Sequence, residues 1–245
     1  FDFGPTLHKW IEGANEHLNN AICEASDRAL AQCYNHIIMP LATAQDKLTQ
    51  VLWGKADFKY RFGIEPKGMW LPECAVDTAT LETLASCGIT FTILAPRQCR
   101  AVIDENGTTM TPGGAGLDVT RPYLCELPSG RTITIVFYHG GLSQDIAFNG
   151  NGILNNGDFF GDTLIRTAAE GDDRILVTAT DGETFGHHHK FGEMAIARMF
   201  RNLHNNPQVA LPSIGRFIEE HPPKAKCVIE ENSSWSCVHG IERWR

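Results

Sequence analysis

The sequence lacks the features that mark nucleic-acid-binding and membrane-spanning proteins. It has no run of lysine and arginine, and its formal net charge is −8, so nucleic acid is not an expected partner. No apolar stretch reaches ~18 residues, the length that a transmembrane helix requires, so no membrane partner is expected. No internal repeat or low-complexity segment is visible. What remains is a chain of 245 residues, enough for one sizeable domain, or one domain and the start of another.

Cysteine is present, but not at the spacing of a metal site. None of the eight cysteines belongs to a Cys-x-x-Cys pair, which argues against structural zinc, and no cofactor is expected. A disulfide framework is not expected at this length and density, so a reducing cytoplasm is the predicted location. The chain begins at Phe1 and both ends are interpreted as cut, so a signal peptide could have been lost. The amino-acid sequence does not indicate an oligomeric state.

Helical segments alternate with short apolar runs along the chain. Helical spacing predicts helices over residues 6–34, 43–62, 77–87, 158–170, 190–205 and 214–220, with Asp77 as an N-cap. Apolar runs predict strands over residues 68–72, 89–94, 119–126, 132–138, 174–180 and 226–229. This alternation indicates an α/β protein with a parallel sheet covered on both faces. A barrel explains acidic residues at several strand ends better than an open sheet does.

The first of these acidic residues is Glu73, which follows the predicted strand 68–72. A carboxylate at the C-terminal end of a strand is where α/β enzymes place their chemistry. By position alone, Glu73 could equally be a helix-start residue facing the helix dipole. The neighbouring Trp70 favours a functional role, because sugar faces stack on aromatic rings.

The second acidic residue is Asp181, which follows the apolar run 174–180 and precedes Gly182. Glycine permits a tight turn from strand to loop. The alternative role, an N-cap, is disfavoured because the next helix is predicted to begin several residues later, near Gly186. Glu183 could orient its neighbours by hydrogen bonding. Two carboxylates placed in this way are the minimum equipment for cleaving a glycosidic bond.

The histidines give weaker indications. His187, His188 and His189 suggest a metal site, but adjacent helical residues do not point the same way, so no metal site is expected. His36 lies in an apolar run closed by Pro40 and, taken alone, is a core histidine.

The last aromatic and histidine residues form a cluster near the end of the chain. It could belong to the core, or it could cover an active-site cleft. Its members are Trp235, Cys237, His239 and Trp244.

Taken together, these segments resemble glycoside hydrolase family 57, an α-glucan-active family. Trp70-Leu71-Pro72-Glu73 is similar to the family's nucleophile motif, which implies that Glu73 is the nucleophile. The segment from Asp181 to His188 is similar to the motif Asp-x-Glu-[Thr/Ser]-[Phe/Tyr]-Gly-x-His. This implies that Asp181 is the acid/base, supported by Glu183 and His188.

Two further segments carry the resemblance into the substrate site. Residues 34–40 are similar to a third motif, whose His36 lines the sugar site. The segment from Trp235 to Trp244 loosely resembles a C-terminal motif, which implies substrate contacts from Trp235 and His239 as well as from Trp70.

The resemblance also implies a fold and an activity. The expected fold is an incomplete seven-stranded (β/α) barrel over residues 1–211, truncated at its N-terminus, followed at 212–245 by the start of a mainly helical region. The expected activity is retaining hydrolysis or transglycosylation of an α-glucan-type oligosaccharide or polysaccharide, by double displacement. The family's opening His-x-His motif is absent, so this piece alone is expected to have weak or no activity and exposed sheet edges.

Two other classes of protein stay open. A metal-dependent hydrolase, such as a polysaccharide deacetylase, would use Asp181 and the nearby histidines as ligands. A non-catalytic relative would bind carbohydrate without converting it.

Overall fold

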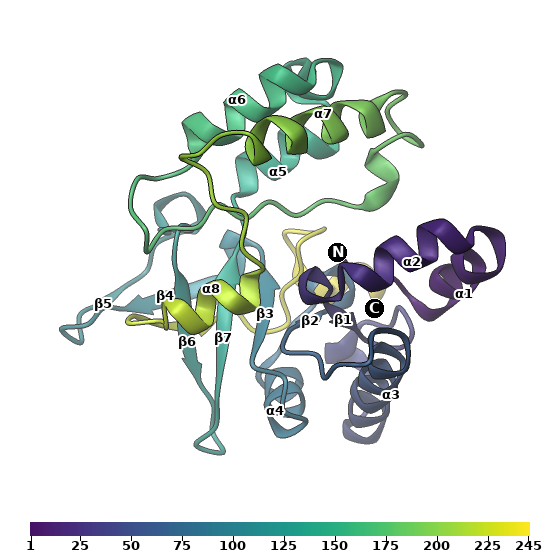
Figure 1. Ribbon diagram of the computed structural model, residues 1–245. Coiled ribbons are helices and arrows are strands. Elements are labelled where there is room, and N and C mark those ends of the chain that lie inside the picture. Colours follow the sequence, from purple (N-terminus) through teal and green to yellow (C-terminus); the bar gives the residue numbers. More distant parts are fainter. The chain divides into compact units, whose positions relative to one another are not determined.

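The computed structural model describes residues 1–114 and 116–245 in full, together with the backbone of residue 115, and it divides into two compact units (Figure 1). The first unit comprises residues 1–117, 122–136 and 213–245, and the second comprises residues 118–121 and 137–212. The predicted division at residue 211, between a catalytic domain and a C-terminal region, stays a prediction.

The first unit contains all the described strands and most of the helices. Its helices are α1 (Pro5–Ala14), α2 (Glu16–Glu24), α3 (Ala44–Phe62), α4 (Thr78–Ser86) and α8 (Ile214–Glu220). Its strands are β1 (Ala31–Gln32), β2 (Met69–Trp70), β3 (Phe91–Leu94), β4 (Cys99–Ile103), β5 (Thr109–Met110), β6 (Pro122–Glu126), β7 (Thr132–Phe137) and β8 (Lys226–Ile229). The second unit contains α5 (Gly140–Ala147), α6 (Gly157–Thr167) and α7 (Gly192–His204).

Local capping explains which helix predictions are confirmed. The Thr43 side chain accepts from Asp46 N at the start of α3, and Asp77 accepts from Thr80 N at the start of α4. The predicted helix 6–34 is broken at Asn15 and is wrong beyond Glu24. Asn15 interrupts it and caps α2, and Ala31–Gln32 pair as strand β1 instead.

The strands form two sheets, and neither closes into a barrel within the described residues. β1 pairs with β2, and the larger sheet has the order β3-β7-β6-β8-β4-β5. The β1–β2 and β6–β8 pairs are parallel, whereas β6–β7, β4–β8 and β4–β5 are antiparallel. The α/β class is therefore confirmed, and the expected all-parallel sheet is wrong, because tight connections such as the turn between β6 and β7 impose antiparallel pairing. The seven-stranded barrel stays a prediction.

Gly68 brings the second and third strands into close contact. It forms a parallel bridge with Phe91, and the Thr92 hydroxyl donates to Met69 O at 2.8 Å. A Cβ atom on Gly68 would lie 2.2 Å from the Phe91 ring, so only glycine fits at this approach. The parallel order of β1 and β2 thus continues to β3.

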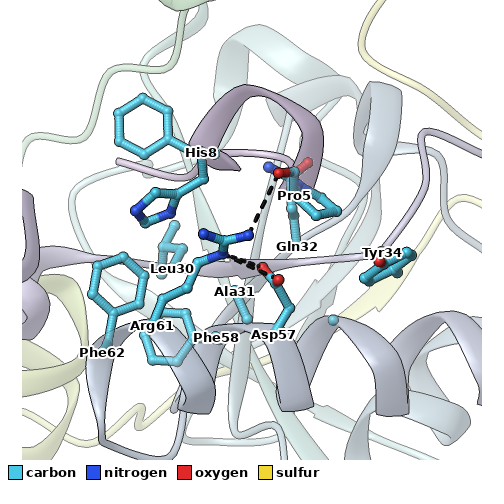
Figure 2. A pocket seen from close by; sticks show the side chains of 12 residues that line it. Pro5, His8, Leu30, Ala31, Gln32, Tyr34, Asp57, Phe58, Arg61 and Phe62 are labelled. Carbon is cyan, nitrogen blue, oxygen red and sulfur yellow. Dashed lines mark hydrogen bonds and ion pairs between the residues drawn. The ribbon is translucent and has the colours of Figure 1, made fainter. Parts of the chain in front are cut away.

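Helix α1 is held to α3 by the guanidinium of Arg61. It forms hydrogen bonds with Asp57 at 3.0 and 3.1 Å and with Pro5 O at 3.5 Å, as Figure 2 shows. The adjoining His8 ring is buried and forms a hydrogen bond with Asn19 at 3.2 Å. Burial lowers the pKa of His8, and the positive charge of Arg61 acts in the same direction.

The second unit has its own apolar core. Helices α6 and α7 pack side by side, and α5 adds to the same cluster (Figure 1). The buried residues of this cluster are Leu142, Ile146, Ile153, Leu154, Phe160, Met199 and Leu203.

A buried ion pair fixes α3 against the start of α4. Lys47 Nζ donates to both oxygens of Asp77, at 2.9 and 2.7 Å, and to Thr80 Oγ1 at 3.2 Å. The two charged side chains are only 5 % and 15 % exposed. Removing one member of such a pair leaves the other charge buried without a partner.

We therefore expect Lys47→Met to lower the free energy of unfolding by about 3 kcal/mol, as measured by urea denaturation. The matched control is Lys59→Met, which breaks an exposed pair with Glu65 and is expected to change stability by less than about 0.5 kcal/mol. Equal effects of the two substitutions would contradict this account of Lys47.

Candidate active site

The carboxyl ends of three neighbouring strands supply the residues of the first candidate site. His36 follows β1, Glu73 follows β2, and Arg97 and Gln98 follow β3. Since the β1–β2 pair and the bridge from Gly68 to Phe91 are parallel, these chain ends emerge on the same edge. All of them lie in the first unit.

Glu73 occupies an unusual backbone conformation. Its φ is +57°, and that of the next residue, Cys74, is +47°. Residues other than glycine seldom adopt the left-handed region, and such positions cluster at functional sites, where the surrounding structure holds them. Glu73 is not in the first turn of α4, whose N-cap is Asp77, so the helix-dipole role is not realised.

Each oxygen of the Glu73 carboxylate has one nitrogen partner. His36 Nε2 lies 3.3 Å from Oε1, and Trp235 Nε1 donates to Oε2 at 3.2 Å. The His36 side chain is 67 % exposed and that of Glu73 is 26 % exposed, so the carboxylate is reachable from solvent. If His36 carries its hydrogen on Nε2, it also donates a hydrogen bond to Glu73, and both carboxylate oxygens are then oriented.

The aromatic rings beside Glu73 form an edge-to-face pair. The centroids of Trp70 and Trp235 lie 5.0 Å apart with an interplanar angle of 73°. The structure therefore brings together four of the predicted site residues: His36, Trp70, Glu73 and Trp235. His239 makes a different contact, with its Nδ1 3.6 Å from Cys237 Sγ.

A backbone ladder ties the Glu73 turn to the segment that carries Trp235. Trp235 N donates to Glu73 O at 2.9 Å. Val76 and Ser233 form an antiparallel bridge with hydrogen bonds of 3.0 and 3.3 Å. A distant part of the chain thus holds the left-handed turn at Glu73 and the chain just beyond it at Val76.

Two residues that the sequence did not indicate hold these segments: Gln98 contacts both, and Arg97 contacts the segment of Trp235. Gln98 is fully buried and donates to Cys74 O, and Arg97 donates to Ser234 O. Their partners lie up to 138 residues away in the sequence, and no local pattern marks such contacts.

The second motif belongs to the second unit and forms a compact turn. Asp181 precedes a 3₁₀ turn over Gly182–Thr184, and its side chain makes no capping hydrogen bond. The predicted strand 174–180 is wrong. This segment makes separate hydrogen bonds, from Ile175 N to Thr120 O and from His139 N to Val177 O, instead of a continuous ladder.

The acidic and histidine side chains of this motif differ in exposure. Glu183 and His188 are exposed, and their Oε2 and Nε2 atoms lie 4.0 Å apart. His188 N also donates to Glu183 O at 2.9 Å. The His189 side chain has a different partner, because its Nε2 lies 3.0 Å from Ala147 O. The three adjacent histidines therefore do not converge on one point.

Asp118 and Arg174 anchor the segment that leads to Asp181. Asp118 accepts from Arg174 Nη1 at 2.6 Å, Arg121 Nε at 2.8 Å, and Thr120 at 2.6 and 3.0 Å. Burial raises the pKa of the Asp118 carboxyl, but the hydrogen bonds from Thr120 and Arg174 and the charge of Arg121 outweigh it, giving a pKa of about 2.

Three further findings concern the described residues. No group of three or more His, Cys, Asp or Glu side chains is arranged to hold a metal ion among the residues that the structure describes. The hollow in Figure 2 is lined by residues of α1, β1 and α3, and none of the predicted site residues lines it. No helix within the described range is both long and apolar enough to cross a membrane.

Comparison with known proteins shows the family. The model of glycosyl hydrolase family 57 matches residues 8–230, so the chain belongs to that family. No curated protein matches the chain.

Solved structures share the fold at low sequence identity. A 4-α-glucanotransferase from Thermococcus litoralis has a TM-score of 0.76 and 18 % identity, over 96 % of this chain and 35 % of its own. An exo-type maltose-forming amylase from Pyrococcus sp. ST04 has a TM-score of 0.74 and 15 % identity, over 97 % and 41 %. A putative polysaccharide deacetylase from Mycobacterium smegmatis has a TM-score of 0.57 and 14 % identity, over 83 % and 65 %. The chain thus spans well under half the length of the first two.

The Asp118 cluster makes the second unit sensitive to acid. Because the folded pKa of about 2 lies below the ordinary 3.8, ionised Asp118 stabilises the fold above pH 3.8. This stabilisation is lost as the pH falls from 3.8 to about 2. The side chain is 40 % exposed, so solvent screening reduces the effect.

We expect Asp118→Asn to lower the free energy of unfolding by about 1 kcal/mol at pH 7, and the difference from the unmodified chain to shrink below pH 4. Urea denaturation at several pH values measures this. Asp162→Asn, an exposed position on α6, is the charge-matched control and is expected to show no such trend. A difference that stays constant with pH would contradict the assignment.

Proposed function

We propose that the full-length protein is a retaining glycoside hydrolase or transglycosylase that acts on α-glucan-type chains. The observation that carries the proposal is Glu73. In a chain of glycosyl hydrolase family 57, it stands on a left-handed turn after a parallel strand, and both its carboxylate oxygens have hydrogen-bond partners. The names of two similar structures, a 4-α-glucanotransferase and a maltose-forming amylase, support the substrate class.

In the proposed first step, Glu73 attacks the anomeric carbon while the bond to the leaving oxygen breaks. Asp181 gives its proton to that oxygen, and a covalent glycosyl-enzyme forms. His36 and Trp235 support this step, because they orient the two carboxylate oxygens before attack.

In the second step, water attacks the same carbon and Asp181 takes its proton, which frees Glu73. A second sugar in place of water gives transglycosylation by the same residues. Glu183 and His188 are proposed to support Asp181, and the Trp70, Trp235 and His239 side chains to contact the sugar.

All eight cysteines are free, in keeping with the proposed reducing cytoplasm.

Glu73→Ala in the full-length protein is expected to lower turnover of maltooligosaccharides by ~10³-fold or more, because the nucleophile is lost. Added azide should then react at the vacated position with α-maltosyl fluoride and yield the β-glycosyl azide, identified by NMR. Glu65→Gln, an exposed acid of the same unit, is the control and should keep full activity. Unchanged turnover in Glu73→Ala would contradict the nucleophile assignment.

Asp181→Ala is expected to lower turnover of maltooligosaccharides by ~10²–10⁴-fold, because their leaving oxygen needs a proton. Glycosyl-enzyme formation from α-maltosyl fluoride needs no proton donor and should lose far less, as followed by fluoride release. Asp172→Asn, an exposed acid nearby, is the control. Equal losses on both substrates would contradict the acid role.

A second candidate function is favoured by one comparison. The structural likeness to a putative polysaccharide deacetylase favours a metal-dependent hydrolase of that kind, in which Asp181 and nearby histidines would bind the ion, whereas the described side chains form no group arranged to hold one. Loss of activity in a chelator, restored by added zinc, would favour this candidate. Tight oligosaccharide binding with no product would instead indicate a non-catalytic relative.

A further inference from the structure

A buried glutamine joins the two chain segments that meet at Glu73. Gln98 is fully buried, and its Nε2 donates to Cys74 O at 2.7 Å and to Ser233 Oγ at 3.1 Å. Its Oε1 accepts from Ala95 N at 2.9 Å. Both the donor group and the acceptor group of the Gln98 amide therefore have hydrogen-bond partners.

The preceding residue, Arg97, holds the same second segment. Its Nε donates to Ser234 O at 3.1 Å, and its Nη2 also donates to Trp235 O. No carboxylate among the described residues forms an ion pair with Arg97. Its guanidinium is thus directed to two backbone carbonyls beside the ring that contacts Glu73.

These contacts close a loop of interactions around the carboxylate. Gln98 holds Cys74, the second left-handed residue, and Arg97 holds the backbone of Trp235. Trp235 in turn donates to Glu73 from both its backbone N and its indole Nε1. Left-handed residues of this kind persist only where neighbouring groups hold them, and Gln98 is the buried group that does so.

We propose that Arg97 and Gln98 are positioning residues that set the direction of the Glu73 carboxylate for attack. This inference rests on the proposed role of Glu73 as the nucleophile. Neither residue touches the reacting atoms, and both act through Cys74 and Trp235. An error of about 1 Å at a reacting atom can lower a rate by ~10²-fold, so the loss of this support has a measurable effect.

The test measures how fast Glu73 itself reacts, using 5-fluoro-α-D-glucosyl fluoride with the full-length protein. The bond from C1 to fluorine breaks, fluoride leaves, and a bond from Glu73 to C1 forms, which adds a mass that peptide analysis locates. Gln98→Met has nearly the same volume without the hydrogen bonds. It is expected to lower the labelling rate by about 10- to 100-fold, with maltooligosaccharide affinity changed less than about 3-fold.

The matched control separates positioning from general destabilisation. Thr92→Val also removes a fully buried side-chain hydrogen bond to the backbone, but that bond goes to Met69 O and not to the Cys74 or Trp235 backbone. It should lose stability in thermal melts and keep the labelling rate within about 2-fold. A folded Gln98→Met variant that labels at the unmodified rate would overturn the proposal.

Two further outcomes are distinguishable. If Gln98→Met does not fold, the test uses Arg97→Met, because Arg97 is exposed. This substitution is expected to lower the labelling rate by about 10-fold. An unchanged labelling rate overturns the proposal. Failure to label the unmodified protein, or labelling on a residue other than Glu73, contradicts the proposed function itself and removes the basis of this inference.

Discussion

Two consecutive left-handed residues, Glu73 and Cys74, can persist only because other groups hold them, and three segments of the first unit meet at the candidate site to do so. A strained backbone of this kind costs ~1–3 kcal/mol for each residue. Hydrogen bonds from Gln98 and Trp235 meet the two carbonyls of the turn, and the bridge between Val76 and Ser233 fixes the chain just beyond it. The direction of the Glu73 carboxylate is consequently set by its backbone together with the hydrogen bonds to its two oxygens.

The elements that could be predicted from the sequence are those fixed by nearby residues. Helices α3 and α4 begin where Thr43 and Asp77 cap them, and these signals are visible within one turn of chain. The hairpin of β6 and β7 follows from a turn between two apolar runs. The run 174–180 fails as a strand because its apolar pattern gives no information about its partners, which are separate groups on Thr120, His139 and Ser143.

The residues of the candidate site could likewise be predicted only where a local sequence motif marks them. Motif similarity indicated Glu73, Trp70 and His36, and the structure gathers them with Trp235, although their roles stay proposals. Arg97 and Gln98 could not be predicted, because a glutamine after a short strand resembles any polar loop residue until its distant partners are known. The burial of Lys47 was invisible for the same reason, since it depends on Asp77 from another element.

The bond from the Trp235 indole to Glu73 also has a consequence for biosynthesis. The two residues are 162 positions apart, so contacts around Glu73 have a high contact order. While the chain leaves the ribosome, Gln98 can reach Cys74 O early, but the bonds from Trp235 to Glu73 cannot form until residue 235 has emerged, long after β1, β2 and β3 can pair. The candidate site around Glu73 is therefore completed late in translation, and a nascent chain that stalls before residue 235 lacks the Trp235 contacts of that site.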